Sequence, residues 1–187
     1  MSPILGIIAS SNFQRVTNSY ASIATTTVGG GGASSITFSS IPATYTHLQI
    51  RAIARSAGGS SEDEYRIRFN SDTGSNYSWH YVLGNGSAAS ASAASTTERI
   101  QIRQMPTTAQ AAGFGGLVLD IFDYANTSKY KTTRALGGYD VNGSGTISLN
   151  SGLWQNTNAI TSITIANERT VNFVEYSSFA LYGIKGA

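Results

Sequence analysis

Apolar and polar residues alternate along several short segments of the chain. In one of them, Tyr65, Ile67 and Phe69 alternate with Arg66 and Arg68. The same alternation recurs in residues 36–38, 47–51, 99–103, 147–149 and 163–165. A period of two is typical of a β-strand that buries one face and exposes the other to water. Apolar residues at sustained helical spacing occur in no window of the sequence. The pattern therefore predicts an all-β protein.

Turn-forming residues separate these segments at intervals of about one strand. They are Gly29–Gly32, Gly58–Gly59, Asp72–Gly74, Gly84–Gly86, Gly137–Gly138 and Asn142–Gly143. Gly, Asn and Asp adopt the backbone conformations that tight hairpin turns require. The spacing predicts about ten or eleven strands, arranged as an antiparallel β-sandwich that is jelly-roll-like.

Two segments depart from this alternation. Residues 117–122 are apolar at nearly every position, which predicts a central strand covered on both faces. Asp120 within this segment would need a buried partner, and Arg134 is a candidate. Residues 87–97 contain only Ala, Ser and Thr, a composition that predicts a long flexible loop.

The N-terminal residues 1–18 differ from the rest, because an apolar tip precedes a polar spacer with no evident strand partner. The large aliphatic residues of this tip are Ile4, Leu5, Ile7 and Ile8. The apolar run is too short to span a bilayer, and no basic residue precedes it as in a secretory signal. Exposed aliphatics on a chain with little charge favour contact with a partner. We expect residues 1–18 to be an anchoring segment and residues 19–187 to be one sandwich domain.

Composition narrows the possible functions. Charged residues make up 12% of the chain, the net charge is +2, and Cys is absent. A nucleic-acid-binding protein is expected to carry a pronounced basic patch, so we expect no nucleic-acid partner. We also expect no membrane insertion and no disulfide framework, which fits synthesis in the cytoplasm.

Residue types that carry catalysis or bind metals are few. The only histidines are His47 and His80, so a zinc site without Cys would need carboxylates as further ligands. Gly143-Ser144-Gly145 falls at an expected hairpin turn, not at the strand-to-helix bend of a nucleophilic serine. We therefore expect no catalytic residue, no metal and no cofactor, and hence no enzyme.

The acidic residues favour structural roles. Glu62–Glu64 are adjacent in an expected loop and predict a solvated cap, whereas glycosidase carboxylates flank a substrate from two sides. Asp120 and Asp123 lie on or beside an expected buried strand, where a structural role is the commoner one. Asp140–Gly145 resembles the start of a calcium loop, but Ser151 replaces the glutamate of the twelfth position, so a hairpin turn is expected.

Arginines and aromatic residues are the candidate contact residues. Arg66, Arg68, Arg99 and Arg103 alternate with expected buried positions and would face outward. They could form a docking face for a partner or an ordinary wet face paired with Glu62, Glu64 and Glu98. Tyr77, Trp79 and Tyr81 share one strand face, which could belong to the core or form a platform for sugars.

Six stretches of the sequence resemble short β-rich structural proteins from the virions of tailed phages, many of environmental or cyanobacterial origin. These stretches are Ser22–Gly29, Ile36–Pro42, Thr44–Arg51, Phe69–Tyr77, Tyr124–Thr133 and Ser178–Gly186. They occur in the same order and span nearly the whole chain. They consist of core and turn residues, so the resemblance assigns no catalytic position.

The resemblance implies a non-enzymatic structural protein on the exterior of a tailed-phage virion. A capsid decoration (cement) protein is the first expectation, and a tail or fibre component that binds a host receptor glycan is the alternative. The implied partners are further copies of the chain, expected as a homotrimer at local three-fold positions, and the major capsid or tail proteins of the particle.

Overall fold

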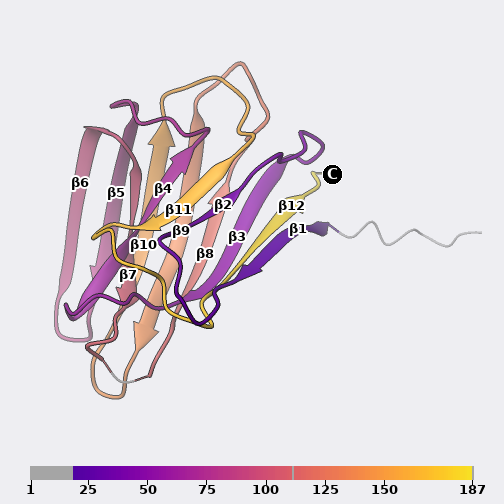
Figure 1. Cartoon of the computed structure of the whole chain (residues 1–187). Helices are drawn as coiled ribbons and strands as arrows, with labels where there is room; N and C mark the ends of the chain where they lie inside the picture. Colours follow the sequence, from indigo (N-terminus) through magenta and orange to yellow (C-terminus); the bar gives the residue numbers. More distant parts are fainter. Residues whose placement is uncertain (1–18, 111, 187) are drawn as a thin grey trace, which may run out of the picture.

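The computed structural model describes residues 19–110 and 112–186, which fold into twelve antiparallel strands with no helix (Figure 1). The strands are β1 (Tyr20–Thr27), β2 (Ser35–Phe38), β3 (His47–Ala54), β4 (Glu62–Phe69), β5 (Tyr77–Gly84), β6 (Ala89–Thr97), β7 (Ile100–Pro106), β8 (Gly115–Ile121), β9 (Lys131–Asp140), β10 (Gly145–Trp154), β11 (Ile163–Asn167) and β12 (Ser178–Ile184). In these residues there is no helix of the length and apolarity needed to cross a membrane.

The strands form two sheets of unequal size. The large sheet has eight strands in the order β1-β12-β3-β8-β9-β10-β5-β6, and the small sheet has four in the order β2-β11-β4-β7. The small sheet lies in front of the large one in Figure 1, with β1 and β6 at the two edges of the large sheet. The predicted antiparallel β-sandwich is confirmed, with twelve strands instead of ten or eleven.

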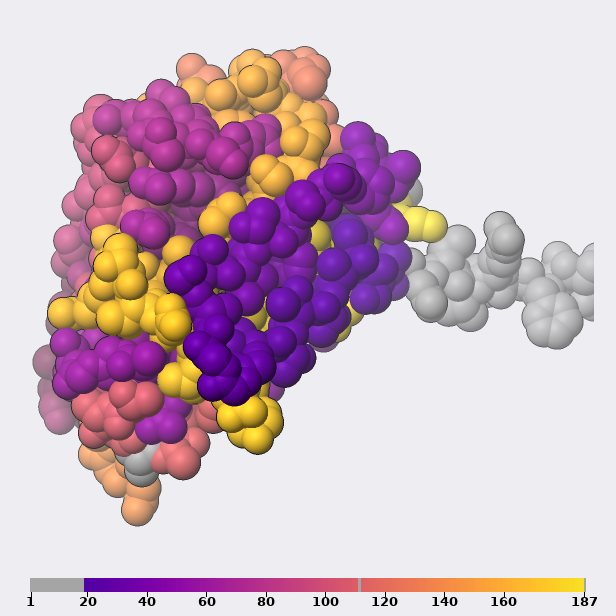
Figure 2. All heavy atoms as spheres, viewed as in Figure 1, coloured from indigo at the N-terminus to yellow at the C-terminus, as the bar shows by residue number. Residues whose placement is uncertain are grey.

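The core lies between the two sheets and consists of the inward-facing residues of both. This core includes Leu48 and Ile50 of β3, Tyr65 and Ile67 of β4, and Leu119 of β8, all of them fully buried. Their neighbours along each strand point outward, as the period of two predicts. Figure 2 shows the small-sheet side, where indigo N-terminal residues lie beside yellow C-terminal ones.

An aromatic cluster closes the core near the turn between β4 and β5. Trp154 lies against Phe69 and Tyr77, with ring centroids 5.6 and 6.3 Å away. The indole Nε1 of Trp154 donates a hydrogen bond to Asp72 Oδ2 at 2.7 Å. Asp72 also accepts bonds from Asn76 Nδ2 at 3.0 Å and from the Gly74 amide at 2.8 Å. This carboxylate therefore ties the turn to the core.

Gly152 marks a place where the two sheets approach closely. A Cβ at this position of β10 would lie 2.6 Å from Thr133 Oγ1 and 2.7 Å from Ile100 Cγ2. Thr133 belongs to the neighbouring strand β9, and Ile100 projects from β7 of the opposite sheet. Only a residue without a side chain fits here.

Several sequence-based predictions about local structure were wrong. Residues 87–97 were expected as a loop, but residues 89–97 form the edge strand β6, because they pair with β5 along its length. Gly137–Gly138 lie inside β9 and not in a turn. Residues 117–122 largely coincide with β8, whose inner face is buried while Val118 on its outer face is 37% exposed. The strand is central, but the described residues cover only one of its faces.

Candidate interaction surface

The outer face of the large sheet carries a concentration of exposed aliphatic side chains. They are Ile53 (59% exposed), Val82 (49%), Val118 (37%), Leu136 (52%), Ile147 (62%) and Leu149 (49%). They come from five adjacent strands, from β3 to β5. At these exposures they present on the order of 500 Å² of apolar surface, a size at which a patch on a monomer is often functional.

Four of these side chains form a continuous ridge across the sheet. Val118, Leu136, Leu149 and Val82 are direct partners on the neighbouring strands β8, β9, β10 and β5. Side chains of directly opposed residues lie in contact on one face of an antiparallel pair. The ridge runs perpendicular to the strands.

A groove runs beside the ridge because the next row of partners is rich in glycine. Gly116, Gly138, Ile147 and Gly84 are opposed across the same four strands. The groove has a volume of about 860 Å³, and Ile53 and the hairpin turn around Gly143 complete its lining. A Cβ added at Gly116 would meet no atom within 4 Å, so this glycine leaves open space above the sheet.

A second groove of about 510 Å³ lies on the other side of the ridge. Val82 and Leu149 form one wall, and His80, Ser151 and Arg134 belong to the next row of partners. The ridge thus stands between two depressions, and the first of them is rich in glycine.

Charged residues of this face lie at the margin of the apolar area. Asp120 accepts a hydrogen bond from Gln49 Nε2 and one from Arg134, each at 2.7 Å. Arg51 donates to Gln49 Oε1 at 2.8 Å and lies over the rings of Tyr20 and Tyr182, 5.4 and 5.3 Å from their centroids. The predicted Asp120–Arg134 pair is confirmed. An apolar centre with a polar rim is the usual anatomy of a protein interface.

The edge strand β6 extends the apolar face with small side chains. Ala89, Ala91 and Ala93 are the partners of Gly84, Val82 and His80, so they lie on the same side of the sheet. All three are exposed. The apolar face therefore reaches the free edge of the large sheet.

The four predicted contact arginines lie on the other side of the molecule, on or beside the outer face of the small sheet. Arg68 pairs with Glu98 at 3.1 Å, and Arg99 Nε donates to Glu168 Oε2 at 2.7 Å. Arg103 pairs with Glu62 at 3.7 Å and also with Glu64. Among the described residues Arg66 has no ion pair, and it lines a small hollow of about 210 Å³ with Arg68.

These contacts match the pairing expected for an ordinary wet face, with Glu168 as a partner that the sequence did not suggest. A docking role for Arg66, Arg68, Arg99 and Arg103 stays a prediction. The predicted anchor residues Ile4, Leu5, Ile7 and Ile8 lie outside the described residues.

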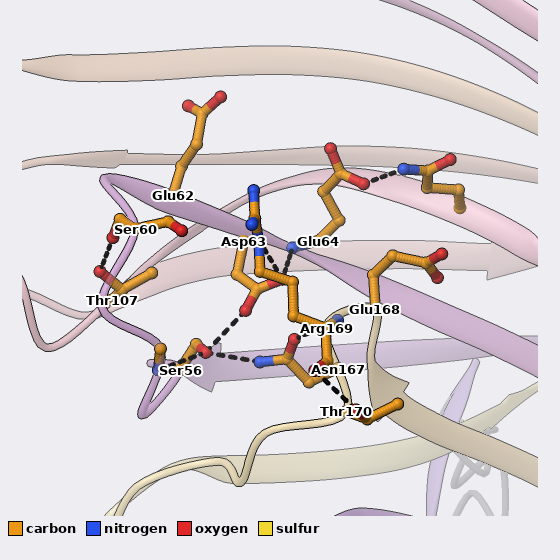
Figure 3. A network of polar contacts seen from close by, with 12 residues as sticks. Ser56, Ser60, Glu62, Asp63, Glu64, Thr107, Asn167, Glu168, Arg169 and Thr170 are labelled. Carbon is orange, nitrogen blue, oxygen red and sulfur yellow. Dashed lines mark hydrogen bonds and ion pairs between the residues drawn. The ribbon is translucent and has the colours of Figure 1, made fainter.

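The acidic cluster at residues 62–64 is not a solvated loop cap. It begins β4, and Asp63 points inward and is 1% exposed (Figure 3). Asp63 Oδ2 accepts a bond from Ser56 Oγ at 2.8 Å, and Ser56 Oγ accepts one from Asn167 Nδ2 at 2.6 Å. Burial raises the pKa of the Asp63 carboxyl, although these bonds and Arg169 partly oppose the shift. The network joins the loop after β3 to β4 and β11.

The two histidines lie on separate strands. His47 Nδ1 accepts a hydrogen bond from the Asp123 amide at 3.0 Å, and His80 is exposed on β5. A hydrogen bond from Lys129 lowers the pKa of Asp123. In the part of the chain that the structure describes, no group of three or more His, Cys, Asp and Glu side chains is placed to hold a metal ion.

The aromatic row on β5 divides between the core and the surface. Tyr77 is fully buried, whereas Trp79 and Tyr81 are half-buried and stack with centroids 5.7 Å apart. Arg103 lies 5.0 Å from the ring centroid of Tyr81. Ser92 and Ala94 of β6, the partners of these two aromatics, are small.

Sequence reasoning missed the outer face of the large sheet. The signal was present in residues 117–122, whose two-sided apolar character was assigned to burial on both faces. Comparison with other proteins gives no further lead, since no protein-family model, no curated protein and no solved structure matches the chain.

Proposed function

We propose that the chain is a non-enzymatic structural protein that decorates the capsid exterior of a tailed-phage particle. The observation that carries the proposal is the apolar outer face of the large sheet, with its ridge and two grooves. On a chain with 12% charged residues, such a patch favours permanent contact with another protein surface. The resemblance of six sequence stretches to virion proteins supplies the biological setting.

The contacts of the carboxylates support a structural role. Asp63 lies in a buried network, Asp72 binds the indole of Trp154, and Asp120 is held by Gln49 and Arg134. Each therefore has partners within the fold, whereas a general acid or base must direct an oxygen at a substrate.

The proposed partners are further copies of the chain and the major capsid protein of the same particle. Residues 1–18, with their four large aliphatics, are the proposed contact to the shell. Burying each aliphatic contributes about 1.5–3 kcal/mol before ordering costs, and ordering takes back about 1–2 kcal/mol per residue. Such a contact becomes effective when several linked copies engage together.

A tail or fibre component that binds a host glycan is the second candidate. The stacked, half-buried rings of Trp79 and Tyr81 favour it, because aromatic faces pack against sugars and only small side chains flank them on β6. In this case Trp79→Ala would abolish binding to host surface polysaccharide, and Tyr130→Ala, an exposed aromatic elsewhere, would not.

The deciding experiment is a cryo-EM map of purified virions of the phage that encodes the chain, with mass spectrometry of the same particles. We expect copies of the sandwich on the outer surface of the capsid shell. Copies on the tail would support the second candidate instead. Absence of the protein from purified particles would refute both.

A further inference from the structure

We propose that a second copy of this chain covers the apolar outer face of the large sheet in a two-fold symmetric dimer. The inference rests on the proposed function and names the partner of this face, with a dimer in place of the homotrimer expected from the sequence. It starts from an arrangement on three strands of the ridge. Val118, Leu136 and Val82 each lie two residues from an outward-facing glycine on the same strand, namely Gly116, Gly138 and Gly84.

A surface with a ridge beside a parallel groove is self-complementary. A two-fold axis that lies in the interface, parallel to the ridge and between ridge and groove, places each ridge over the groove of the other copy. Each strand then lies over its own counterpart, and the contact is isologous. Leu136 of one copy lies over Gly138 of the other, and Val118 lies over Gly116, whereas on β10 Leu149 lies over Ile147, so two aliphatic side chains meet there. Two sheets packed in this way interdigitate their side chains as in a sandwich core.

The charges at the margin agree with the same axis. Arg134 lies one row beyond the ridge on β9, and Asp140 lies one row beyond the groove on the same strand. The axis that places ridge over groove therefore brings Arg134 of each copy over Asp140 of the other. The Arg134 side chain is 62% exposed, and Asp140 is exposed at the end of β9. Opposite charges thus meet at both ends of the contact.

The available area is sufficient for a stable dimer. A standard interface buries about 800 Å² on each partner, and the six aliphatics supply on the order of 500 Å². The groove floor, the alanines of β6 and the rim residues Arg134 and Asp140 lie on the same face and supply the remainder.

The test is sedimentation-velocity ultracentrifugation of the full chain from about 1 to 100 μM. We expect the wild type to have twice the monomer mass. Gly116→Val fills the groove at a position with open space for a side chain, and Leu136→Lys places a charge on the ridge. Because symmetry makes each change act twice, we expect dimerisation about 100-fold weaker for either variant. Circular dichroism and thermal unfolding at the lowest concentration show whether the variants stay folded.

Two further variants make the test specific. Tyr130→Lys alters an exposed residue that belongs to neither ridge nor groove, and we expect it to dimerise like the wild type. Asp140→Arg places a second positive charge opposite Arg134 of the other copy and leaves the Asp120–Arg134 pair intact, and we expect it to weaken the dimer.

A monomeric wild type at 100 μM, a trimeric mass, or a dimer unaffected by Gly116→Val and Leu136→Lys would overturn the proposal. The solution mass and the position on virions are measured separately. A monomer found on the capsid would therefore refute the dimer and leave the proposed function standing, and a dimer absent from virions would do the reverse.

Discussion

Replacement of Asp72 by Asn tests whether one carboxylate holds the β4–β5 turn against the core. Asn can keep one carbonyl oxygen for the Gly74 amide, but its NH₂ group would then face two other donors, Trp154 Nε1 and Asn76 Nδ2. Trp154 is 1% exposed, so water does not readily replace the lost acceptor. The substitution therefore leaves a buried indole N–H without a partner.

The expected magnitude follows from that single unpaired donor. A buried polar group left unsatisfied costs about 1–3 kcal/mol. A loss of about 2 kcal/mol lowers the Tm of a protein of this size by roughly 4–8 °C. Unfolding by urea at pH 6, followed by tryptophan fluorescence, measures the difference directly.

The pH dependence gives an independent reading of the same contact. Burial alone would raise the pKa of Asp72, but hydrogen bonds from Trp154, Asn76 and Gly74 outweigh it and lower the pKa below the usual value. A carboxyl group whose pKa is lower in the folded state than in the unfolded state stabilises the fold at pH values above its unfolded pKa. This stabilisation is lost as the pH falls through the folded pKa. The difference in free energy of unfolding between the wild type and Asp72→Asn should therefore be smaller at pH 3 than at pH 6.

Asp123→Asn is the matched control, because this carboxylate also has a lowered pKa but pairs with Lys129 near the surface. We expect a loss below about 1 kcal/mol, as for exposed ion pairs. If Asp72→Asn unfolds like the wild type at pH 6, or if the gap is the same at pH 3, the carboxylate does not hold the turn.

Three further predictions concern the core, the buried carboxylate and the N-terminal segment. Gly152→Ala should lower the free energy of unfolding in urea by about 1–3 kcal/mol, because the added methyl group overpacks the space between the sheets. Gly116→Ala has open space at its Cβ and should lower the free energy of unfolding of the dilute monomer far less. Because burial raises the pKa of Asp63, wild type should lose stability relative to Asp63→Asn as the pH rises from 3 to 6; an unchanged difference in urea midpoints would contradict the buried network. Deletion of residues 1–12 should leave the sandwich folded by circular dichroism but reduce the amount of protein incorporated into particles, and equal incorporation would show that the segment is not an anchor.

The fold could be predicted from the sequence because most strands of the sandwich bury one face, and this burial appears in the sequence as alternating apolar and polar residues. In β4, Tyr65, Ile67 and Phe69 are fully buried and the intervening arginines face outward. β6 could not be found this way, since it is exposed on both faces and therefore has no apolar period. Its strand character comes from pairing with β5, a tertiary contact that a window of sequence does not contain.

The interaction surface was harder to predict than the fold. Val118, Leu136 and Leu149 lie far apart in the sequence and become neighbours only through the register of β8, β9 and β10. Asp63 is a similar case, because two flanking glutamates made a solvated loop the natural interpretation. Its burial depends on Ser56, which comes from the loop after β3, and on Asn167, which comes from β11.

The order in which the strands pair also constrains how the chain can be synthesised. Among the described strands, β1 pairs only with β12 and β2 only with β11, so each finds its partner more than a hundred residues further along the chain. While the protein is still being made, both strands and their apolar residues must wait until β11 and β12 have been translated. Contacts of such large sequence separation are associated with folding in milliseconds to seconds. A chain stalled before residue 163 would leave Ile36 and Phe38 without their sheet, so premature termination should yield aggregation-prone fragments instead of a smaller folded domain.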